Sequence, residues 1–140
     1  MSRKEFYQKE AARFVEKIRQ EYEPEKIYIF GSFAEGKITS NSDIDFFIVK
    51  KTSKSRRERN REVSRLLLDR QVPVDILVYT PAEIARRTKL GDGFILGIIN
   101  SGKLVYEKNN LILAKEWIKK ADDDYKLDSP INYTNVLMEK

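Results

Sequence analysis

The sequence predicts a small α/β fold, in which a mixed β-sheet of about four strands is flanked by helices. Two observations support this prediction. Segments with helical apolar spacing alternate with short runs of β-branched and aromatic residues. The 140 residues are also enough for one hydrophobic core and too few for two. We therefore expect the order helix, strand, strand, helix, strand, helix, helix, strand and helix, with the helices mainly on one face of the sheet.

The first predicted helix covers about residues 3–22. Ser2 and Glu5 have the spacing of a capping box, and Pro24 ends the apolar stripe that follows. That stripe consists of Tyr7, Ala11, Phe14, Ile18 and Tyr22. Strands are predicted at 26–30, which Gly31 stops, and at 43–49. A surface helix is predicted over 55–70, where apolar residues recur at helical spacing with arginines on the other face.

Strands and helices also alternate after residue 70. A third strand is predicted at 74–79, and Thr80-Pro81 with Glu83 is typical of a helix start. A buried helix is expected at 94–100, followed by a strand at 103–106, and a striped helix at 111–125 that packs on the sheet or on a partner. Residues 1–106 are thus predicted to form the domain, and residues 107–140 a C-terminal helix and tail.

The composition excludes several kinds of chemistry. The chain contains no cysteine and no histidine, so it has no thiol nucleophile, no disulfide and no histidine base.

Its net charge of +5 favours anionic partners such as nucleotides or an acidic protein. The start is charged and the longest apolar run, 94–99, is far shorter than a membrane span, so we expect a cytoplasmic protein without a membrane. The basic stretch 50–61 is interpreted as a solvated face; a surface for RNA or an acidic partner is the alternative.

Polar residues of a phosphate- and metal-binding type follow the first two strands. Gly31 and Ser32 come directly after a strand, where a phosphate can approach the backbone and a hydroxyl is at hand. Asp43 and Asp45 are two residues apart in a predicted strand, so both side chains leave the same face. Asp75 lies in a later, otherwise apolar strand, where an unpaired buried carboxylate is costly. If the strands are neighbours, three carboxylates converge and suit two magnesium ions and phosphoryl chemistry.

This combination resembles the minimal nucleotidyltransferases of the DNA polymerase beta superfamily over about residues 1–106. The resemblance rests on Gly31-Ser32, on Asp43-x-Asp45 after ten intervening residues, and on Asp75. It implies a small α/β domain that transfers a nucleoside monophosphate from a triphosphate to a hydroxyl and releases pyrophosphate. It also implies that Gly31 and Ser32 position the triphosphate, and that Asp43, Asp45 and Asp75 are catalytic ligands of two Mg²⁺ ions.

The turn after the Gly-Ser pair departs from this family, because Glu35 stands where many relatives have a basic residue. Lys37, or one of the arginines Arg56, Arg57 and Arg59, is the candidate for the missing positive charge at the nucleotide. The spacing from Gly31 to Lys37 does not indicate a P-loop, because Ile38 follows the lysine and a strand, not a helix, is expected after the turn.

A second resemblance concerns residues 113–125, which are similar to the opening helix of a HEPN domain, a module often paired with minimal nucleotidyltransferases. Together the two resemblances imply a magnesium-dependent transferase that moves AMP from ATP to a protein hydroxyl, as the antitoxin of a HEPN-type toxin. They leave a dimer or a hetero-complex open and do not favour nucleic acid as partner. The alternatives are a small-molecule nucleotidyltransferase of the aminoglycoside type and a weakly catalytic module that neutralises its partner by contact.

Overall fold

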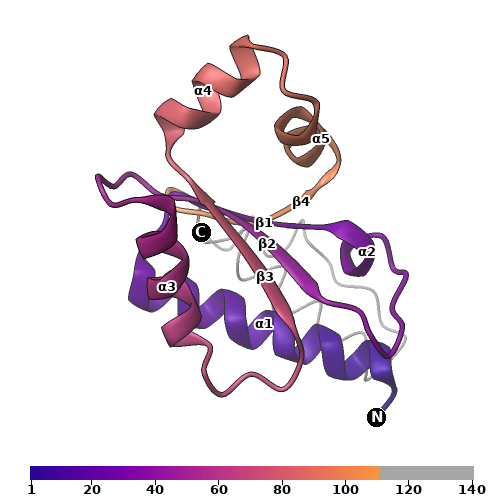
Figure 1. Ribbon diagram of the computed structural model, residues 1–140. Coiled ribbons are helices and arrows are strands. Elements are labelled where there is room, and N and C mark those ends of the chain that lie inside the picture. The colour runs from indigo at the N-terminus through magenta and orange to yellow at the C-terminus, as the bar shows by residue number, and fades with distance from the viewer. Residues whose placement is uncertain (111–140) are drawn as a thin grey trace.

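The computed structural model describes residues 1–110, which form one sheet with helices on both faces (Figure 1). The strands are ordered β3-β2-β1-β4; β1 pairs antiparallel with β2 and β4, and β2 pairs parallel with β3. In chain order the elements are α1 (Arg3–Tyr22), β1 (Lys26–Phe30), α2 (Gly31–Ala34), β2 (Ile44–Val49), α3 (Arg56–Leu66), β3 (Val74–Tyr79), α4 (Pro81–Lys89), α5 (Gly93–Ser101) and β4 (Lys103–Glu107). This is an α+β arrangement, so the predicted fold class is confirmed.

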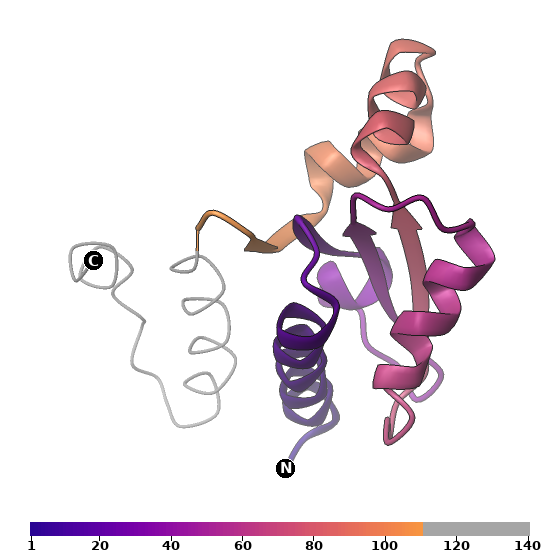
Figure 2. The same ribbon diagram turned by 90° about the vertical axis from the view of Figure 1, so that its left-hand side faces the viewer.

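The larger core lies between the sheet and the helices α1 and α3, which run along the same face (Figures 1 and 2). Helix α1 begins at the predicted capping box, in which the Ser2 hydroxyl accepts a hydrogen bond from the Glu5 amide. The predicted apolar stripe faces the sheet, where Phe14 and Ile18 are fully buried. They meet alternate strand residues such as Phe46, and burial of these side chains is the main favourable term in folding.

A smaller core lies on the opposite face of the sheet. The sequence analysis expected the helices mainly on one face and did not predict this second core. Ile95 and Ile98 of α5 are buried against the aromatic side chains of Tyr28, Phe47 and Tyr79. Figure 1 shows α4 and α5 above the sheet, near the end where β3 stops. The other end of this face, where β2 and β3 begin, is not part of that core.

Several boundaries differ from the sequence prediction by a few residues. Helix α3 ends at Leu66 instead of continuing to residue 70, because the chain turns at Leu67. Strand β2 begins at Ile44, so Asp43 lies just before it. The short helix α2 was not predicted; it occupies the turn that was expected after Gly31. The helix expected at 111–125 and the HEPN-like segment within it lie outside the described residues. No helix of residues 1–110 is long and apolar enough to cross a membrane.

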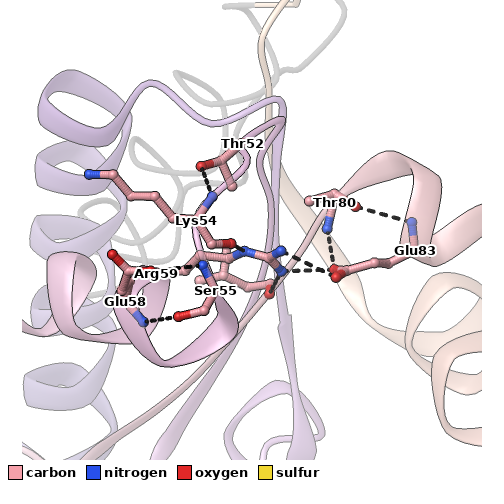
Figure 3. A network of polar contacts seen from close by, with 8 residues as sticks. Thr52, Lys54, Ser55, Glu58, Arg59, Thr80 and Glu83 are labelled. Atoms are coloured by element: carbon pink, nitrogen blue, oxygen red, sulfur yellow. Dashed lines mark hydrogen bonds and ion pairs between the residues drawn. The ribbon is translucent and has the colours of Figure 1, made fainter.

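An ion pair joins α3 to α4 beyond the end of β3 (Figure 3). The Arg59 side chain is buried, and its Nη1 and Nη2 atoms donate to the Glu83 carboxylate at 2.8 and 3.2 Å. The same guanidinium donates to the carbonyl oxygens of Lys54 and Val78. Glu83 also completes the capping box of α4 with Thr80. The Arg59 hydrogen bonds lower the pKa of Glu83, so this contribution to stability is complete above the ordinary pKa of 4.5 and declines as the pH falls below it.

We expect Arg59→Ala to lower the free energy of unfolding by about 2 kcal/mol at pH 7, because it leaves the Glu83 carboxylate and two carbonyl groups without their donor. Urea denaturation measures this change. The matched control is Arg57→Ala at an exposed position of the same helix, for which we expect less than about 0.5 kcal/mol. Equal effects of the two substitutions would contradict the role of the ion pair.

Candidate active site

Gly31 connects the end of β1 to α2 and lies directly against Asp45. The register pairs Phe30 with Asp45, which brings the following residue to the edge of that carboxylate. Gly31 has φ +80°, and a Cβ atom built on it would lie 2.0 Å from Asp45 Oδ2. Glycine is therefore required here for two reasons, the left-handed backbone and the close approach of the carboxylate.

Asp45 and Asp75 are neighbours across the parallel pair β2 and β3. They are register partners, so their side chains leave the same face of the sheet. Ile44 and Phe46, on either side of Asp45, are fully buried on the other face, which fixes this orientation. Burial, followed by the charges of Asp75 and Asp43, raises the pKa of the half-buried Asp45 carboxyl to about 6. The site thus concentrates negative charge that a cation would neutralise.

Asp43 lies at the end of a loop that α1 holds in place. The buried Ser42 accepts a hydrogen bond from the Tyr7 hydroxyl through its carbonyl oxygen at 2.8 Å, and its hydroxyl accepts one from the Thr39 amide at 2.7 Å. Asp43 itself is exposed. Within residues 1–110 no three metal-ligating side chains stand close enough to form a ready cation site. The charges of Asp75 and Asp43 still act on Asp45, since after burial they are the further causes of its raised pKa.

The turn after Gly31 carries the other residues predicted to contact the nucleotide. Ser32 is exposed in α2, and its carbonyl oxygen accepts a hydrogen bond from the Lys37 amide at 2.8 Å. The Lys37 ammonium lies 3.5 Å from a carboxylate oxygen of Glu35, and both side chains are exposed. Glu35, the acid that departs from the family's pattern, therefore pairs with Lys37, the candidate for the missing positive charge.

The three arginines considered as alternatives to Lys37 lie elsewhere. Arg59 is engaged with Glu83, and the Arg56 guanidinium lies 4.4 Å from the ring centre of Tyr79, the last residue of β3. Arg57 is between them at the start of α3. Arg56 and Arg59 make these contacts at the end of β3 away from Asp75, so the structure does not bring their side chains to Gly31 and Ser32.

The sequence of the chain matches a known family. Residues 11–100 match the family model described as the nucleotidyltransferase domain. The chain belongs to this family. Membership implies a nucleoside triphosphate substrate and, in general, a divalent metal. A comparison with curated proteins found no match to this sequence.

Solved structures support the fold of this nucleotidyltransferase. A candidate nucleotidyltransferase from Sulfolobus solfataricus, solved at 1.40 Å, is 23% identical with a TM-score of 0.53; the match covers 78% of this chain and 92% of that one. A chain in the crystal structure of a toxin-antitoxin with AMP-PNP is 19% identical in sequence to this one, with a TM-score of 0.51. The match covers 82% of this chain and 94% of that one. At these identities the likeness concerns the fold.

Two contacts near the carboxylates were not predicted from the sequence: that of Phe30 with Phe94, and that of Tyr7 with Ser42. Phe30 lies opposite Asp45 on the same face of the sheet, and its ring contacts that of Phe94 in α5, with 5.8 Å between ring centres. Strand alternation predicts that Phe30 shares a face with Tyr28, but nothing in the sequence indicates that a helix 64 residues later reaches it. The Tyr7–Ser42 hydrogen bond is equally invisible, since it joins residues 35 positions apart.

Proposed function

We propose that this nucleotidyltransferase moves AMP from ATP to a hydroxyl of a partner protein, with magnesium held by Asp43, Asp45 and Asp75. The observation that supports this most strongly is the register pair of Asp45 and Asp75 beside the closely approaching Gly31. The oxygen donors fit a hard cation such as Mg²⁺. Burial, followed by the charges of Asp75 and Asp43, raises the pKa of Asp45, and a bound cation would favour the charged form of this carboxyl.

In the proposed reaction the acceptor oxygen bonds to the α-phosphorus, and the bond from that phosphorus to the oxygen bridging to the β-phosphate breaks. Pyrophosphate leaves. Magnesium, when bound, neutralises charge on the attacking and leaving oxygens. Asp75 is exposed and so accessible to an acceptor, whose hydroxyl proton it accepts. Gly31 and Ser32 position the triphosphate in this proposal, and the lack of a side chain at Gly31 brings their backbone close to the Asp45 carboxylate.

A protein is the proposed acceptor for two reasons. The toxin-antitoxin structure with AMP-PNP shares this fold, which supports a paired protein and an adenine nucleotide. The net charge of +5 also favours an acidic partner. On these grounds we propose that the chain is a cytoplasmic antitoxin that modifies a HEPN-type toxin.

The test uses ATP labelled at the α-phosphate, with γ-labelled ATP in parallel. The purified full chain is incubated with magnesium and a native lysate, beside the Asp43→Ala, Asp45→Ala variant. We expect the wild type alone to pass the α-label, and not the γ-label, to a protein band. A label on small molecules only would favour a small-molecule acceptor. No transfer by the wild type, combined with protection against a partner by the double variant, would favour neutralisation by contact.

Lys37 and Glu35 offer a prediction about nucleotide affinity. Lys37→Ala should weaken the binding of Mg-ATP about threefold, and Glu35→Gln should strengthen it by a similar factor, because the substitution releases Lys37 from its 3.5 Å pair. Both effects are small because exposed charges are screened by solvent. Isothermal titration calorimetry measures the Kd, and unchanged affinity in Lys37→Ala would remove this residue from the nucleotide site.

A further inference from the structure

The ring of Phe94 is exposed beside the candidate active site. It is 52% exposed, and among the large hydrophobic side chains that are exposed in residues 1–110 it is the single aromatic one. The four are Met1, Leu68, Leu90 and Phe94. A solvent-exposed aromatic ring next to a site of concentrated charge is a feature that a ligand with both an apolar and a charged part would use.

The ring is linked to the carboxylates by a continuous row of side chains on one face. Asp75 pairs with Asp45, Asp45 pairs with Phe30, and the Phe30 ring meets the Phe94 ring edge to face at 87°. The step from Asp45 to Phe30 is about 5 Å between Cβ atoms, and that between the two ring centres is 5.8 Å. A nucleotide whose phosphates lie at Asp45 therefore has an aromatic surface within reach of its base.

Helix α5 holds the Phe94 backbone firmly. The Asp92 carboxylate caps the helix by accepting hydrogen bonds from the amides of Phe94 and Ile95 at 3.0 and 3.2 Å, and Arg87 pairs with it at 3.2 Å. The neighbouring Ile95 is fully buried in the smaller core. Gly97, one turn further on, is exposed, and a Cβ atom built on it would meet no atom within 4 Å.

We infer that Phe94 is the stacking surface for the base of the bound nucleoside triphosphate. This inference rests on the proposed function, which places the phosphates at Asp45, and it adds a residue that binds the base. Phe30 supports the Phe94 ring edge to face, and the exposed part of that ring is free to stack on the flat base. Stacking on an aromatic ring is tolerant of base identity, so Phe94 contributes affinity for any base, and the choice among bases is made by other groups.

The test compares two ligands, Mg-ATP and Mg-tripolyphosphate, of which the second has no base. Calorimetry on the full chain should give a Kd for ATP that is about tenfold weaker in Phe94→Ala, and a Kd for tripolyphosphate that is unchanged. Leu90→Ala is the matched control, because Leu90 is also exposed and precedes the same helix; it should alter neither Kd. Phe94→Trp should keep ATP affinity, and ATP should quench its indole fluorescence more than that of the wild type, which contains Trp117, whereas tripolyphosphate should not.

The outcomes separate the inference from the function on which it rests. Equal weakening for both ligands, or no weakening for either, would overturn the role of Phe94 while leaving the triphosphate site in place. Absence of quenching by ATP in Phe94→Trp would overturn it as well. If the wild type binds neither ligand, the proposed function fails, and the inference fails with it.

Discussion

Replacing Asp45 by asparagine is expected to abolish nucleotidyl transfer and, at the same time, to stabilise the protein. Transfer should fall about a thousandfold or more, because the substitution removes the proposed ligand charge at the centre of the site. The Tm should rise at pH 7, because the folded protein no longer holds a half-buried carboxylate against two like charges. We expect a gain of about 1 kcal/mol, since the Asp45 side chain is partly exposed and solvent screens its interactions. The α-label assay and thermal unfolding measure the two effects.

The pH dependence of this difference follows from the raised pKa. Asp45 titrates at about 6 in the folded chain and at 3.8 ordinarily, so between these values the folded state binds more protons than the unfolded state. The contribution of Asp45 to the stability of the wild type therefore becomes less favourable as the pH rises from about 4 to 6, and this penalty is complete above 6. Wild type and Asp45→Asn should have similar Tm values below pH 4 and differ above pH 6. Magnesium should raise the Tm of the wild type alone. A variant that is less stable at pH 7 would contradict this account.

Gly31→Ala is expected to cost activity far more than stability. The alanine must adopt φ +80°, which lowers the free energy of unfolding by about 1–2 kcal/mol. Its Cβ atom would lie 2.0 Å from Asp45 Oδ2, so the carboxylate must rotate away from its position in the site. We expect transfer to fall about a hundredfold, since small displacements of positioned groups have effects of this size.

Gly36→Ala separates the effect of backbone strain from the effect of displacing the Asp45 carboxylate. Gly36 also has φ +80°, but a Cβ atom there would meet nothing within 4 Å. The two variants should lose similar stability in urea denaturation, and Gly36→Ala should retain transfer. Similar losses of transfer in both would show that strain in the turn, and not displacement of Asp45, limits the reaction.

Local signals predicted most of this architecture. The capping boxes at Ser2 and Thr80 and the strand ends at Gly31 and Tyr79 agree with the structure, because each depends on residues close in sequence. The neighbouring placement of Asp45 and Asp75 needed one further assumption, that their strands pair, which the parallel register confirms. Their role as metal ligands remains a prediction.

Contacts between distant segments could not be predicted in the same way. The arginines of α3 have the charge required at a phosphate, and only the fold shows that Arg59 is instead engaged with Glu83. The contact of Phe94 with Phe30 depends on how the α4–α5 pair returns to the sheet, which no local pattern specifies. The four-residue helix α2 is too short to show helical periodicity in the sequence.

The two ends of strand β3 belong to different parts of the molecule, the candidate active site and the α3–α4 ion pair. Asp75 lies near its beginning, and the Val78 carbonyl that accepts from Arg59 lies three residues later, about 10 Å along the strand. Substitutions around Asp75 are therefore expected to leave the α3–α4 ion pair intact, and loss of that pair is expected to leave the position of Asp75 unchanged. The residues around Asp75 can thus vary without loss of the stability that Arg59 and Glu83 contribute.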